Sequence, residues 1–145
     1  MRNFLLVLVF IMGTASQLLS DSRFVRDNFF GIVYDTYRGL MWSDQEKPSA
    51  HHWEDAINYC EDLKLAGYED WHLPNYNELF SLIDLSKSPV VDEAFTNSLK
   101  GIYWSSTQYK HNYKWHWIVE LDNSDSYYAY EDDSYQYTMC VRTER

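Results

Sequence analysis

Residues 70–79 constrain the fold most, because this short stretch contains the end of a strand and the start of a helix. Trp71 and Leu73 alternate as residues on one face of a strand do. Pro74 has no amide hydrogen for a strand ladder, so the strand is expected to end there. The sequence therefore predicts a sharp corner between two elements at Pro74.

A short helix is expected to begin directly after this corner. Asn75 is a favourable N-cap residue, and Glu78 three positions later completes the pattern of a capping box. The apolar residues that follow recur at intervals of three and four, which is the spacing of one buried helix face. They are Tyr76, Leu79, Leu82 and Ile83.

A longer helix is predicted before the corner, with Ser49 as its N-cap and its end near Ala66. Gly67 stands where a C-terminal cap belongs. The apolar residues of this segment recur with helical spacing and are expected to form its buried face. They are Trp53, Ala56, Ile57, Cys60 and Leu63.

Most of the remaining chain is typical of short strands. The predicted strands are residues 30–35, 40–42, 102–107, 115–121, 127–131 and 135–142. In the strand predicted at residues 115–121, His116 and Glu120 lie on one side. The apolar residues that alternate on the other side are Trp115, Trp117, Val119 and Leu121. Two helices with an antiparallel sheet predict an α+β domain.

Residues 1–20 have the organisation of a secretory signal peptide. Arg2 supplies a positive start, residues 4–12 are an unbroken apolar run, and small residues follow. The run is too short to span a bilayer. We therefore expect an exported protein of the periplasm, the cell surface or the medium, with a polar leader at residues 21–29 and one domain at residues 30–143.

Cys60 and Cys140 are the two cysteines of the chain. An even pair in an exported protein is typical of a disulfide, and no Cys-x-x-Cys motif points to zinc or redox chemistry. The bridge would close a loop of about 80 residues, which corresponds to about 4–5 kcal/mol of stabilisation on the chain-entropy model.

The charge of the chain excludes two classes of partner. The formal net charge is −10; without Arg2 of the signal peptide, 11 basic residues face 22 acidic ones, which gives −11. A protein this acidic repels nucleic acid and anionic lipid, so neither is an expected partner.

Five sequence anchors together resemble the Lcl C-terminal domain family, which was long catalogued as a domain of unknown function. In chain order they are Gly39-Leu40-Met41-Trp42, the helix that carries Cys60, Trp71-His72-Leu73-Pro74 with Glu78-Leu79, Tyr103-Trp104-Ser105-Ser106-Thr107, and Cys140-Val141-Arg142. The resemblance covers residues 30–143. The pairing of the Trp-x-Leu-Pro corner with the Tyr-Trp-Ser-Ser-Thr strand is its most specific part.

The resemblance implies a C-type-lectin-like fold, with two helices packed on a twisted antiparallel β-sheet. The family's namesake is the C-terminal part of a bacterial collagen-like adhesin that binds sulfated glycosaminoglycans, so an adhesin-like role is also implied. His72 and Met139 stand where the family has Arg in many members. Together with the acidic net charge, these two positions favour neutral sugars or basic protein segments over sulfated glycans.

No residue pattern indicates catalysis, so we expect a protein that is not an enzyme and needs no cofactor. Ser105, Ser106 and Thr107 lack a Gly-x-Ser-x-Gly turn, and structural hydrogen bonding is their expected role. No His-x-x-x-His pair predicts a zinc site among the five histidines. They are His51, His52, His72, His111 and His116.

Acidic residues near the end of the chain are candidates for a calcium site, although their spacing matches no EF-hand loop. The candidates are Asp122, Asp125, Asp132 and Asp133, with Glu131 beside them. A solvated acidic surface is the alternative interpretation.

Tyrosines are unusually dense between residues 122 and 137; they are Tyr127, Tyr128, Tyr130, Tyr135 and Tyr137. Cross-strand packing could bury these rings. Rings left on an outer face would instead form a platform for a sugar or a protein, and Tyr128 and Tyr130 share one strand face. We therefore predict a binding domain that recognises a glycan or a protein through this aromatic, acidic face. The alternative is a structural or interaction subunit of the cell envelope with no small ligand.

Overall fold

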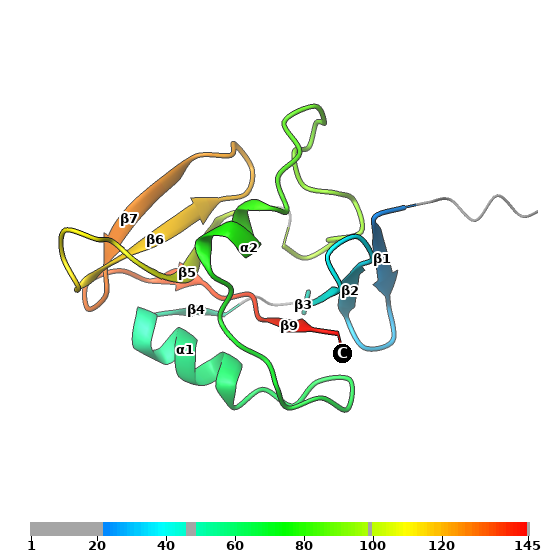
Figure 1. Ribbon diagram of the computed structural model, residues 1–145, viewed down its shortest axis with the longest axis horizontal. Helices are drawn as coiled ribbons and strands as arrows, with labels where there is room; N and C mark the ends of the chain where they lie inside the picture. Colours follow the sequence, from blue (N-terminus) through cyan, green and yellow to red (C-terminus); the bar gives the residue numbers. More distant parts are fainter. Residues whose placement is uncertain (1–21, 46–48, 99, 145) are drawn as a thin grey trace, which may run out of the picture.

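The computed structural model describes residues 22–45, 49–98 and 100–144. Two small helices and two curled sheets make up this part of the chain, and Figure 1 shows one sheet toward each side of the view. The expected signal peptide, residues 1–20, lies outside the described residues.

The first sheet contains four antiparallel strands in the order β1-β2-β3-β9. Their bounds are Phe24–Asp27 for β1, Ile32–Asp35 for β2, Leu40–Ser43 for β3 and Val141–Thr143 for β9. β1 lies within residues 21–29, the segment expected to be a polar leader. It belongs to the sheet because it pairs with β2 along its whole length and buries Phe24 against Phe95.

The second sheet contains five strands in the order β4-β8-β5-β6-β7. Their bounds are Ala50–His51 for β4, Gln136–Tyr137 for β8, Ile102–Gln108 for β5, Trp115–Glu120 for β6 and Ser126–Tyr130 for β7. Neighbouring strands are antiparallel except β5 and β8, which meet as a short parallel pair.

The expectation of a single twisted antiparallel sheet is therefore wrong. Residues 135–142 do not form one strand, because β8 belongs to the second sheet and β9 to the first. Thr138, Met139 and Cys140 cross from one sheet to the other and are buried. Two of their amides donate hydrogen bonds outside the strand ladders. The Thr138 amide donates to the Ser49 carbonyl, and the Cys140 amide donates to the Ser43 hydroxyl at 2.8 Å.

Helix α1, Trp53–Glu61, is shorter than the helix expected over residues 49–66. Ser49 does not cap it, because the next two residues pair with β8 as strand β4. The N-cap is His52, whose side chain makes no capping hydrogen bond. The predicted apolar face is confirmed: Ala56 and Cys60 are buried, and Trp53, Ile57 and Leu63 pack partly buried around the same core.

Helix α2, Tyr76–Phe80, begins as predicted. The Asn75 side chain accepts a hydrogen bond from the Glu78 amide, and the Glu78 carboxylate accepts one from the Asn75 amide, both at 2.8 Å. This confirms the capping box. The strand expected just before Pro74 is only a single bridge between His72 and Val141. No helix in the described ranges is long and apolar enough to cross a membrane.

Cys60 and Cys140 form the predicted disulfide, with their Cα atoms 5.4 Å apart. Both residues are fully buried. The bond joins the buried face of α1 to the segment that crosses between β8 and β9. It therefore connects the helix to both sheets at one point.

Tryptophans fill the two halves of the core. Trp42 packs with the residues around α2, whereas Trp71 and Trp104 pack with α1 and the disulfide. All three are buried. Trp53, on the expected buried face of the helix, is only partly buried and stacks on His116.

Replacement of Trp71 by alanine is expected to lower the free energy of unfolding by about 3–5 kcal/mol, because the cavity it leaves cannot collapse fully. The indole is 2% exposed and donates a hydrogen bond to the Tyr68 carbonyl at 3.2 Å. Chemical denaturation measures the loss. Phe29, which is 88% exposed, provides the matched control, since Phe29→Ala should change stability by less than about 0.5 kcal/mol. Equal losses in the two variants would contradict the assignment of Trp71 to the core.

Removal of the disulfide in a Cys60→Ser, Cys140→Ser double variant is expected to cost about 2–5 kcal/mol of stability. Equilibrium denaturation of the variant and of the wild type, each with and without reductant, measures the effect. Reductant should destabilise the wild type alone. If it destabilises both proteins equally, the bond is not the source of the difference.

Candidate binding surface

The two sides of β6 have different surroundings. His116 and Ile118 face α1, where His116 stacks on Trp53 and Ile118 is buried. Trp115 and Trp117 point to the opposite side, because side chains alternate along a strand. These two rings are only partly buried. The α1 side of the strand is therefore core, and the other side is partly open to solvent.

Six rings on the open side form one continuous surface, which we name the aromatic face. They are Tyr76, Tyr109, Trp115, Trp117, Tyr128 and Tyr130. The register of β6 and β7 sets Trp115 opposite Tyr130 and Trp117 opposite Tyr128. Neighbouring ring centroids lie between 4.3 and 5.9 Å apart, a separation at which aromatic pairs attract.

Tyr128 lies at the centre of the aromatic face. Its ring stacks on that of Tyr109 at 4.3 Å and 12°, and it meets the edges of Trp115 at 5.5 Å and Trp117 at 5.9 Å. Even so, the residue is 46% exposed. A ring held from three sides and still open offers contact area at little further cost in conformational entropy.

Hydroxyl groups of β5 hold the aromatic face in place. The Ser105 hydroxyl donates to the Trp117 carbonyl at 2.8 Å, and the Thr107 hydroxyl accepts from the Tyr76 amide at 2.8 Å. The Ser106 amide donates to the Pro74 carbonyl. The structural role predicted for Ser105 and Thr107 is therefore confirmed.

Sequence reasoning found two of the six rings. Tyr128 and Tyr130 share one side, as predicted, because both contact Trp115. The other four were missed, although the alternation of Trp115 and Trp117 was visible. What was missing was the pairing of β6 with β7, which brings the two aromatic sets onto one surface.

The three other predicted tyrosines lie elsewhere, so the five do not form one cluster. Tyr127 points to the other side of β7, is 46% exposed, and its hydroxyl donates to the Asp125 carboxylate at 2.9 Å. Tyr135 lies against the His52 ring at 3.9 Å. Tyr137 lies beside Tyr103 at the other edge of β5.

The calcium candidates lie at the two ends of β7. Asp122 and Asp125 precede the strand, and Asp132 and Asp133 follow it. A strand of this length spans about 17 Å, so the two pairs are too far apart to share one ion. No group of three or more histidine, cysteine or acidic side chains in the described part of the chain is arranged to hold a metal ion.

The histidines are dispersed and contact different partners. His51 lies 2.7 Å from the Ser49 hydroxyl, His52 packs on Tyr135, His72 lies 3.5 Å from Glu78, and His111 lies beside Tyr109. His116 is the buried member of the set, at 2% exposure.

His116 is held between an aromatic ring and a carboxylate. Its ring stacks on Trp53 at 3.6 Å and 10°, and its Nε2 lies 3.0 Å from the Glu131 carboxylate. Its Nδ1 is buried and has no hydrogen-bond partner within the described residues. Burial lowers the pKa of His116 below its ordinary value, and the Glu131 hydrogen bond opposes this shift only in part.

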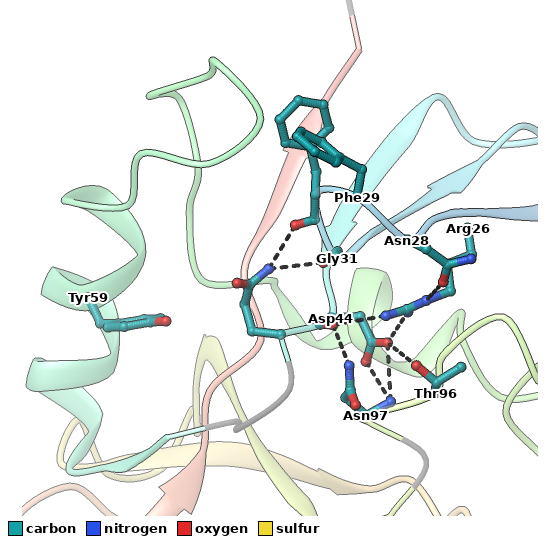
Figure 2. Close-up of a pocket in the computed structure, with 10 residues that line it drawn as sticks. Arg26, Asn28, Phe29, Gly31, Asp44, Tyr59, Thr96 and Asn97 are labelled. Carbon is teal, nitrogen blue, oxygen red and sulfur yellow. Dashed lines mark hydrogen bonds and ion pairs between the residues drawn. The ribbon is translucent and has the colours of Figure 1, made fainter.

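A cleft of about 830 Å³, shown in Figure 2, lies between α1 and the first sheet. Tyr59 projects from α1 on one side, and Asp44 and Asn97 lie opposite. The Asp44 carboxylate is fully buried and binds Arg26 and the Asn97 amide. The Asn97 side chain donates to the Asp44 carbonyl at 2.8 Å. These polar groups hold one another, so the floor of the cleft has a structural role.

Comparison with known protein families gives a match over most of the chain. The family model described as the Lcl C-terminal domain matches residues 31–142. The chain belongs to the Lcl C-terminal domain family. No protein with a curated description matches it in sequence. The match spans both sheets from β2 to β9, so the aromatic face lies within the Lcl C-terminal domain.

Acidification is expected to destabilise the protein through His116. The unfolded chain takes up a proton near pH 6.5, whereas the folded protein does so only at a lower pH. The free energy of unfolding should therefore have its highest value above about pH 6.5. It should fall, by at most about 1.4 kcal/mol per pH unit, as the pH drops through the lowered pKa of His116 in the folded protein. Denaturation curves between about pH 7.5 and 5 measure this slope.

A His116→Gln variant should show a smaller slope, because glutamine cannot take up the proton. His111→Gln, which changes an exposed histidine, should keep the slope of the wild type. An unchanged slope in the His116 variant would contradict the assignment.

Proposed function

We propose that this Lcl C-terminal domain is a non-catalytic binding domain whose contact surface is the aromatic face. The observation that carries the proposal is the position of Tyr128, which is 46% exposed although three other rings hold it. Core rings are buried, and scattered surface rings are not packed in this way. Contiguous exposed aromatic surface is typical of interaction sites.

The shape of the aromatic face favours a ligand that lies across it. Trp115, Trp117 and Tyr130 are partly open beside Tyr128, and α2 closes one end through Tyr76. Flat rings of this kind suit the apolar side of a sugar ring or the side chains of a protein. We propose a glycan or a protein as the ligand on this basis.

Charge restricts the ligand further. The exposed carboxylates of Asp122, Asp125, Asp132 and Asp133 border β7, and Lys114, which lies over the Tyr130 ring, is 3.4 Å from Asp132. Sulfate groups would meet like charge here. We therefore propose neutral sugars or basic protein segments rather than sulfated glycans.

Family membership suggests an adhesin-like extracellular domain. Export is part of our proposal, and the buried disulfide is consistent with it because such bonds persist in oxidising compartments. A C-type-lectin-like arrangement of the fold, a periplasmic or surface location and the absence of catalysis are likewise proposed.

Replacement of both Tyr128 and Tyr130 by alanine is expected to weaken binding by about 30-fold or more, the effect typical of central aromatic residues in an interface. Retention is measured on a panel of neutral oligosaccharides, heparin and lysine-rich peptides, together with the melting temperature. A Tyr37→Ala, Tyr135→Ala double variant is the matched control, because both rings are more than 60% exposed and lie outside the aromatic face.

The control should bind as the wild type does, and both variants should stay folded. If the Tyr128 and Tyr130 variant unfolds, these rings belong to the core and the proposed surface does not exist. Tight binding of the wild type to heparin at physiological salt would contradict the charge argument.

A further inference from the structure

Strand β7 forms one outer edge of the second sheet. The strand order ends with β6 and then β7, and Figure 1 shows β7 (orange) at the outside of the sheet. The strand carries Tyr128 and Tyr130 of the aromatic face. A ligand that reaches these rings therefore also reaches the outer edge of β7, which pairs with no further strand within the described residues.

The register shows which backbone groups point outward. The Glu131 amide donates to the Lys114 carbonyl, and the Glu120 amide donates to the Asp125 carbonyl, so these directly opposed residues are hydrogen-bonded pairs. Hydrogen-bonded and non-hydrogen-bonded pairs alternate along an antiparallel ladder. Tyr127 and Ala129 are therefore the residues of β7 whose backbone groups bond to β6.

Ser126, Tyr128 and Tyr130 consequently direct their N–H and C=O groups away from β6. They lie at every second position along the open edge. This is the spacing at which an added strand would exchange hydrogen bonds with β7.

The edge of β7 lacks the features that protect other edges. Its sequence, Ser-Tyr-Tyr-Ala-Tyr, contains no lysine, proline or glycine, and its pairing with β6 shows no bulge. The other described edges are protected: β1 carries Arg26 and Asp27, β4 has two residues, and β9 is covered by backbone hydrogen bonds to His72.

Negative charge at both ends of β7 determines which kind of segment can pair with its open edge. Asp122 and Asp125 lie before β7, and Asp132 and Asp133 lie after it, all four exposed. A second copy of the chain would bring acidic residues against these ends in an antiparallel pairing, which is unfavourable. A segment with basic residues at both ends would be complementary.

We propose that the open edge of β7 binds an extended segment of a partner protein as a sixth strand, with Lys or Arg at both ends of that segment. The inference rests on the proposed function, because the added strand would extend the aromatic face, and it selects a basic polypeptide from the two proposed ligand classes. Alternate side chains of the segment lie beside Tyr128 and Tyr130, and the others lie beside Tyr127.

A synthetic peptide with a Val-Thr-Val-Thr-Val centre and two lysines at each end is the probe. It is titrated against the full, oxidised protein, and amide hydrogen exchange is followed by NMR. The amides of Ser126, Tyr128 and Tyr130 should exchange at least about tenfold more slowly with peptide bound, while those of Tyr127 and Ala129 change little. A peptide with two glutamates at each end should bind at least about tenfold more weakly.

A substitution of the first strand residue tests the edge without removing a ring. Ser126→Pro removes one outward N–H and no hydrogen bond to β6, and proline is tolerated at the first residue of an edge strand. It should weaken peptide binding about tenfold. Ser126→Ala is the control, because it keeps the N–H and loses only the hydroxyl that lies 3.2 Å from the Tyr76 hydroxyl.

Three results would overturn the inference. Peptide binding without protection of the outward amides would mean that the rings alone make the contact, which leaves the proposed function intact. If the protein binds glycans through Tyr128 but does not bind the lysine peptide, strand addition is rejected and the proposed function stands. If the protein without peptide is a dimer and its outward amides of β7 already exchange slowly, the edge binds a second copy of the chain instead.

Discussion

The Cys60–Cys140 disulfide is the constraint on which the rest of the structure depends. It fixes α1 against the buried segment in which the chain leaves the second sheet and enters the first. That segment has no ladder of its own, and its amides rely on bonds such as that from Cys140 to Ser43. The covalent bond therefore fixes the junction at which the two sheets meet.

With this junction fixed, the second sheet can use its two sides differently. α1 covers one side, where Trp53 stacks on His116 of β6 and the disulfide is buried. α2 covers part of the other side through Tyr76 and Leu79. α2 reaches this side through Tyr76, its first residue, and Trp115, Trp117, Tyr128 and Tyr130 stay partly or largely exposed.

Local signals in the sequence predicted the local parts of this fold. The capping box at Asn75, the buried face of α1 and the disulfide pair depend on nearby residues or on a simple count of cysteines, and all three are confirmed. The division of residues 135–142 between two sheets could not be predicted, because hydrophobic alternation does not say which strand is the neighbour. β1 was missed for a related reason, since only its pairing with β2 distinguishes it from a leader.

The same limit applies to the binding surface. Tyr128 and Tyr130 were visible in the sequence, but Tyr109, Trp115 and Trp117 join them only through strand pairing. We propose that ligands bind on this surface rather than in the cleft lined by Tyr59 and Asn97. Hydroxyl-radical footprinting, with and without the panel ligand that binds best, distinguishes the two sites. Reduced oxidation of Tyr109, Trp115 and Tyr128 is the predicted result; reduced oxidation of Tyr59 and Phe29, with the aromatic face unchanged, would contradict it.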